Sequence, residues 1–174
     1  MWKRIFLLLA VFSNGFLMKP AMAGDIVGQV APNWILSDLE GTSISLYQEV
    51  EEGKTVVMFF WASWCKNCQS LMPFIRELRE AKGDKPISIY LMNIWEDGDP
   101  VEFIKNHNIG VPLILHAENV ARRYNIQLTP GIVVVDHTRK IQYVRQHQEN
   151  LSDVVSHLQK ILDVQLGSTI SAMS

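Results

Sequence analysis

Continuous apolar runs predict two central strands that are buried on both faces of a sheet. Residues 55–60 contain no charge and no polar alternation, and residues 87–94 are almost as apolar. Such runs are typical of central strands that helices cover on both sides of the sheet. A shorter run at 111–115 predicts a further strand.

Two antiparallel strand pairs are predicted where apolar segments flank polar turns. Residues 34–36 and 43–46 lie on either side of a turn that contains Gly41. Residues 132–135 and 141–144 likewise flank a polar segment and predict a hairpin.

Apolar residues at helical spacing separate these strands. One amphipathic pattern begins after Cys65 and ends at Gly83. Pro100 is a favoured first residue for a second helix, and Asn150 can cap the last one. Further helices are expected over residues 100–108, 120–124 and 151–166. Strands that alternate with helices predict an α/β fold with a central mixed β-sheet flanked by helices, an N-terminal β-hairpin and a central helix–strand insert.

The N-terminus has the pattern of an export signal. Lys3 and Arg4 precede the apolar run 5–12, and Ala21-Met22-Ala23 supplies a cleavage site. The apolar run is much shorter than the ~20 residues that a membrane-spanning helix needs. We therefore expect a signal peptide at 1–23, a single domain at 24–167 and a C-terminal tail at 168–174, in a periplasmic protein.

Composition narrows the class of protein. Of the 174 residues 48% are apolar and the formal net charge is −2, values that exclude a disordered chain. Removal of Lys3, Arg4 and Lys19 with the signal leaves 13 basic and 18 acidic residues. Without a basic excess we expect no nucleic-acid partner.

Two cysteines, Cys65 and Cys68, carry the candidate chemistry. A disulfide across three positions closes too small a loop to restrict the unfolded chain, so a redox pair is favoured over a structural staple. At a helix start, unpaired amide hydrogens and the helix dipole favour a thiolate. Cys65 is thus the expected nucleophile and Cys68 the resolving thiol. Lys66 should favour the thiolate, whereas the neighbouring Asn67 is neutral.

Metal binding is the main alternative. Zinc normally needs four ligands, and the five histidines are scattered, so no metal or cofactor is expected. The same two thiolates could instead bind or deliver Cu(I), which soft sulfur ligands favour.

The segment from Phe60 to Cys68, with Pro73 in the helix that follows, resembles the active-site segment of thioredoxin-fold proteins. The lead-in 27–34 and the insert 100–124 resemble exported thiol:disulfide interchange proteins of the TlpA/ResA type. The resemblance implies that Thr129-Pro130 is a cis-proline segment beside the sulfurs. There Thr129, Pro130 and Trp64 would bind substrate, and Trp61 would help form the apolar surface.

Some positions depart from the family pattern. Phe59 and Leu71 stand where certain relatives carry an acid, and Lys66-Asn67 differs from the usual dipeptide and should tune the redox potential. Glu96 and Asp97 follow a predicted strand, where we expect a solvated loop. The resemblance implies a thiol:disulfide oxidoreductase, acting as a reductase on periplasmic protein disulfides, including those of cytochrome c maturation. An oxidase working in the opposite direction is the alternative, since a lowered Cys65 pKa would favour it. A small domain of this kind is expected to be a monomer. A membrane electron donor would re-reduce it.

Overall fold

A five-stranded mixed sheet forms the centre of the molecule. The computed structural model describes residues 26–145 and 149–172. The strand order is β5-β4-β3-β6-β7, and β3 pairs in parallel with β4 and antiparallel with β6. The strands are β3 (Thr55–Trp61), β4 (Ile87–Asn93), β5 (Leu113–Ile114), β6 (Gly131–Val135) and β7 (Ile141–Val144). The predicted central strand at 55–60 is therefore confirmed.

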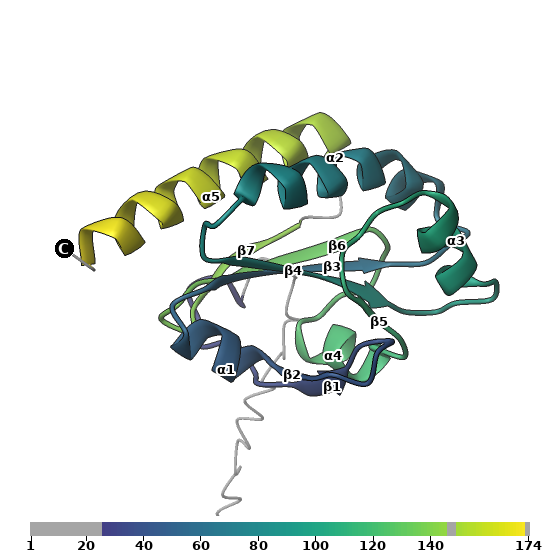
Figure 1. Ribbon diagram of the computed structural model, residues 1–174, viewed down its shortest axis with the longest axis horizontal. Coiled ribbons are helices and arrows are strands. Elements are labelled where there is room, and N and C mark those ends of the chain that lie inside the picture. The colour runs from purple at the N-terminus through teal and green to yellow at the C-terminus, as the bar shows by residue number, and fades with distance from the viewer. Residues whose placement is uncertain (1–25, 146–148, 173–174) are drawn as a thin grey trace, which may run out of the picture.

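Helices cover both faces of this sheet (Figure 1). One face carries α2 (Lys66–Lys82), α3 (Pro100–Asn106) and α5 (Leu151–Ala172). The other carries α1 (Leu46–Glu51), α4 (Glu118–Arg123) and the antiparallel pair β1 (Ile35–Ser37) and β2 (Ser43–Ser45). The expected α/β fold with an N-terminal hairpin is present.

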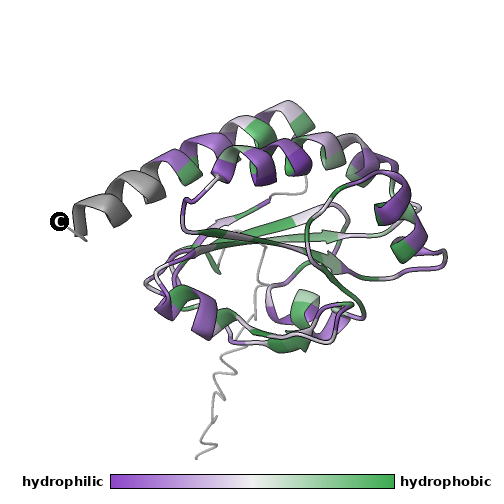
Figure 2. Cartoon of the chain, in the orientation of Figure 1, coloured by the Kyte–Doolittle hydropathy of each residue, from purple (hydrophilic) through white to green (hydrophobic). Residues whose placement is uncertain are grey.

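The side chains of β3 divide between the two layers because successive residues of a strand point to opposite faces. Val57, Phe59 and Trp61 join the cluster beneath α2 and α5, whereas Met58 and Phe60 join the opposite cluster. In Figure 2 the mostly hydrophobic strands of the sheet lie between helices that carry both hydrophilic and hydrophobic residues. Every residue of β3 is buried, which explains its unbroken apolar run.

Two helical segments differ from the sequence prediction. Helix α1 was not expected, because its six residues are too few for a periodic signal, although Leu46 and Val50 are both buried one turn apart. Helix α5 runs past Gly167 to Ala172, where the tail was expected to begin. A single glycine costs a helix only about 1 kcal/mol, so it does not have to end one.

The expected signal peptide at 1–23 lies outside the described residues, as does His147. Among the described residues no helix is long and apolar enough to cross a membrane.

Candidate active site

The end of β3 and the start of α2 place the two cysteines. β3 ends at Trp61, and Cys65 is the N-cap of α2, with an extended backbone. The Cys65 Sγ accepts a hydrogen bond of 3.2 Å from the backbone N–H of Cys68. The two residues form a disulfide with their Cα atoms 5.2 Å apart. A sulfur that already accepts a helix-terminal N–H is well placed to carry negative charge when reduced.

The two sulfurs differ in their surroundings. Cys65 is 5% exposed, whereas Cys68 is fully buried. Cys68 belongs to the apolar cluster that also contains Phe59 and Leu71. The two positions where an acid might have been expected are thus apolar and buried.

The two tryptophans before Cys65 have different environments. Trp64 is 48% exposed, and its indole Nε1 donates a hydrogen bond of 2.8 Å to the Trp95 carbonyl. Trp61 is fully buried and packs on Phe103 with ring centroids 5.5 Å apart. The expectation that Trp61 forms part of the surface around the thiols is therefore wrong, since β3 points this side chain into the core.

Thr129 and Pro130 lie at the same edge of the sheet as the cysteine loop. Antiparallel pairing of Phe60 with Gly131 puts the start of β6 beside the end of β3. The Thr129–Pro130 peptide bond is cis and Pro130 is buried, while the preceding Leu128 is exposed.

Arg145 supports this segment from the end of β7. Its Nη1 donates to the Pro130 carbonyl at 2.8 Å and its Nη2 to the Glu149 carbonyl at 3.0 Å. The sequence analysis missed Arg145. Its only signal in the sequence is a charge directly after an apolar run.

Lys66 and Asn67 occupy the first turn of α2 with exposed side chains. Within the described ranges no group of three or more histidine, cysteine or acidic side chains could hold a metal ion.

Glu96 and Asp97 lie in the loop after β4, as expected, and Asp97 is exposed, but the Glu96 side chain is half-buried and bonded to other segments. Its carboxylate accepts hydrogen bonds from the Ser63 N–H at 2.8 Å and the Ser63 Oγ at 2.7 Å. It also accepts from Asn93 Nδ2 at 2.7 Å and from the Gly98 N–H at 3.0 Å. Burial opposes ionisation, but these hydrogen bonds outweigh it and hold the pKa of Glu96 below its usual value. Sequence alone could not pair Glu96 with a residue 33 positions away.

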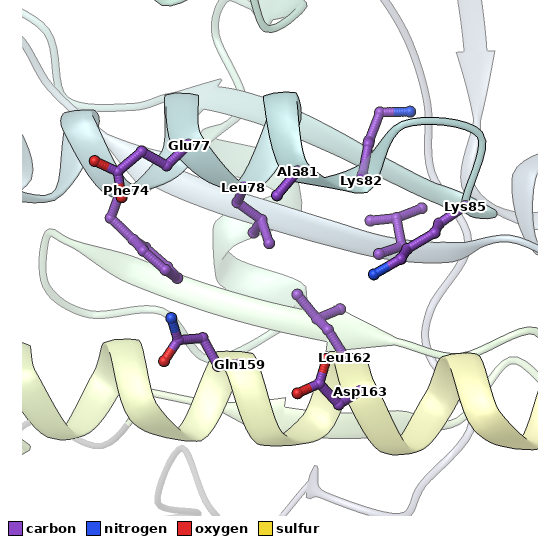
Figure 3. A pocket seen from close by; sticks show the side chains of 10 residues that line it. Phe74, Glu77, Leu78, Ala81, Lys82, Lys85, Gln159, Leu162 and Asp163 are labelled. Atoms are coloured by element: carbon purple, nitrogen blue, oxygen red, sulfur yellow. The ribbon is translucent and has the colours of Figure 1, made fainter.

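A groove between α2 and α5 lies away from this site (Figure 3). Phe74 and Leu78 of α2 face Leu162 of α5 across it. Phe74 is nine residues along α2 from Cys65, which corresponds to about 14 Å of helix. The groove therefore takes no part in the redox site.

Comparison with known proteins agrees with this geometry. The Redoxin family matches residues 26–162. The thiol-disulfide oxidoreductase ResA of Geobacillus thermodenitrificans is 30% identical over 153 residues, covering 87% of this chain and 85% of the relative. The structure of the thioredoxin domain of a thiol-disulfide oxidoreductase from Bacteroides vulgatus superposes with a TM-score of 0.65 at 26% identity, covering 78% of this chain and 97% of that one.

A second solved structure, a thiol:disulfide interchange protein from Bacteroides sp., has a TM-score of 0.64 at 26% identity. It covers 79% of this chain and 90% of its own. With the Cys65–Cys68 disulfide at the start of α2, these matches identify the chain as a thiol-disulfide oxidoreductase of thioredoxin-like fold that belongs to the Redoxin family.

Proposed function

We propose that this protein is an exported thiol:disulfide reductase that passes electrons from a membrane donor to protein disulfides in the periplasm. The observation that carries the proposal is the unequal placement of the two sulfurs. Cys65, the N-cap of α2, keeps a small exposed area of 5%, whereas Cys68 in the first turn is fully buried. This arrangement supports Cys65 as the attacking thiolate and Cys68 as the resolving thiol.

In the proposed reaction, the Cys65 thiolate attacks a substrate disulfide and forms a mixed disulfide, which releases one substrate thiol. Cys68 then attacks the Cys65 sulfur, releasing the second substrate thiol and forming the Cys65–Cys68 bond. Two electrons and two protons thereby pass to the substrate. A donor dithiol in the membrane restores the reduced pair by the reverse exchange.

Trp64, Thr129 and Pro130 are proposed to bind the substrate segment beside its cysteine. The support is the exposed Trp64 ring on one side of Cys65 and the 128–130 segment at the same sheet edge. An extended substrate could add its backbone to Thr129 as a further strand. Disulfides of proteins that mature as c-type cytochromes belong to the proposed substrates. Lys66 and Asn67, exposed beside Cys65, are proposed to tune the potential, and the protein is proposed to act as a monomer.

Trapping tests the assigned roles. Cys68→Ser in the full chain should accumulate mixed disulfides on Cys65, seen as bands on non-reducing gels that a reductant removes. Cys65→Ser is the matched control and should trap none. Equal trapping by both variants would contradict the assignment. The exported protein should begin at Gly24 when its N-terminus is sequenced.

The direction of electron flow has its own measurement. Equilibration of the protein with glutathione should give the Cys65–Cys68 pair a reduction potential close to that of thioredoxin, about −270 mV. A strong oxidant such as DsbA has a potential of about −120 mV. An insulin-reduction assay and Cu(I) titration on the same protein address the metal alternative. Tight Cu(I) retention without disulfide exchange would favour a copper-binding protein instead.

A further inference from the structure

The Glu96 carboxylate accepts five hydrogen bonds beside the segment that leads into Cys65. It lies in the loop after β4 and accepts hydrogen bonds from both the backbone N–H and the hydroxyl of Ser63, two residues before Cys65. Asn93 Nδ2 and the backbone N–H groups of Asp97 and Gly98 also donate hydrogen bonds to this carboxylate. None of these contacts belongs to the exchange chemistry described so far.

Ser63 is held from both sides. Its carbonyl accepts a hydrogen bond of 2.7 Å from Gln69 Nε2 of α2, while its N–H and hydroxyl reach Glu96. There is no spare room at this contact, because a Cβ on Gly98 would lie 2.8 Å from the Ser63 Oγ. The peptide that leads into Cys65 is thus fixed between α2 and the loop after β4.

The carboxylate also brings a negative charge to the redox pair. Burial opposes ionisation of Glu96, but the hydrogen bonds that it accepts keep its pKa below the usual value, so it is ionised at neutral pH. Consecutive Cα atoms are about 3.8 Å apart, so a carboxylate bound to the Ser63 N–H lies within about 10 Å of the Cys65 backbone. That is close to one Debye length at physiological ionic strength, so salt screens the charge only in part.

Other charged groups lie on the neighbouring segments. Lys66 follows Cys65 in α2, and Asp97 follows Glu96. Glu118 of α4 accepts the Trp95 N–H, and Arg145 binds the Pro130 carbonyl. Glu96 is the acid among them that bonds directly to the loop carrying Cys65.

We propose that Glu96 is a positioning residue for the redox pair: its carboxylate fixes Ser63 ahead of Cys65, and its charge disfavours the Cys65 thiolate and so makes the pair more reducing. The inference rests on the proposed function, because it explains how a cysteine pair at a helix start could act as a reductase. The helix start favours the thiolate and thus an oxidising pair, and a fixed anion beside the loop opposes that tendency.

Glu96→Gln tests the charge with little change in shape. In the reduced protein, the pH profile for alkylation of Cys65 by iodoacetamide should move to lower pH. Removing one charge at about 10 Å should change the ratio of thiolate to thiol about twofold to tenfold. The potential against glutathione should rise accordingly, by at most about 30 mV for a tenfold change. Asp97→Asn removes a neighbouring exposed charge and should have a smaller effect.

Ser63→Ala tests the positioning, because it removes the hydroxyl bond and keeps the charge. Exchange with a protein disulfide should slow severalfold while the alkylation profile stays near that of the wild type. This variant also keeps the proposal open to refutation if Glu96→Gln does not fold. An unchanged exchange rate in Ser63→Ala would refute the positioning.

An alkylation profile of Glu96→Gln that does not move, that moves to higher pH, or that moves no further than that of Asp97→Asn would overturn the role of the charge. Failure of the proposed function has a different signature. A wild-type potential near that of a strong oxidant would refute the reductase, while a shift of the Glu96→Gln alkylation profile to lower pH would still support the role of Glu96.

Discussion

The Arg145 Nη1 donates a hydrogen bond of 2.8 Å to the carbonyl of Pro130. The same guanidinium reaches the Glu149 carbonyl through Nη2, so it links the segment before β6 to the segment before α5. A charged donor on a partly buried carbonyl is worth about 1.5–3 kcal/mol. Arg145 thus stabilises the residue that follows Thr129 in the proposed substrate site.

Arg145→Met should lower the free energy of unfolding by about 1.5–3 kcal/mol, because both carbonyls lose a charged donor. Exchange with a protein disulfide should slow more than exchange with a small disulfide, since a small molecule needs less of the 128–130 segment. Urea unfolding and the two exchange rates measure these effects. Arg122→Met, at an exposed position of α4, is the control and should change stability by less than about 0.5 kcal/mol. Equal stability of the two variants would contradict the role of Arg145.

The two tryptophans should respond differently to truncation. Trp61→Ala removes a fully buried ring that packs on Phe103, and should cost about 3–5 kcal/mol in urea unfolding. Trp64→Ala removes a half-exposed ring and one hydrogen bond, and should cost at most about 1.5 kcal/mol. Similar losses in both variants would mean that Trp64 is as much a core residue as Trp61.

Gly131 is required by close packing at the start of β6. A Cβ there would lie 2.6 Å from Ile126 Cγ2 and 3.2 Å from Phe60 Cβ. Gly131→Ala should therefore destabilise the fold by about 1–3 kcal/mol. Truncating Ile126 to alanine in the same chain removes the clashing methyl, so the double variant should lose less stability than the sum of the single ones. Strict additivity would show that the clash does not cause the loss.

Stability should depend on Glu96 as pH falls. The folded-state pKa of Glu96 is below its usual value of 4.5, so the ionised carboxylate stabilises the fold above that pH. The contribution is lost as pH falls through the lower folded-state pKa. The stability difference between wild type and Glu96→Gln, from urea unfolding at several pH values, should thus be largest near neutrality and shrink below pH 4.5. A difference that grows on acidification would contradict the hydrogen-bonding pattern at Glu96.

Local pattern determined the architecture and the reactive pair. The unbroken apolar run of β3 required a strand covered on both faces, and the structure places β3 at the centre of the sheet. Cys65 and Cys68 could be placed at a helix start because spacing within one turn is a local property. Asn150 as the cap of α5 was equally local, and its Oδ1 accepts the Asp153 N–H.

Only tertiary structure decided which residues support that pair. Glu96 meets Ser63 across 33 positions, and Arg145 meets Pro130 across 15, through pairing and packing that no short-range pattern encodes. Trp61 and Trp64 show the same limit, since the end of β3 turns one ring into the core and leaves the other exposed. Hydrophobic periodicity indicates which face of a helix or strand is buried. The partner of a polar side chain depends on where distant segments come to lie.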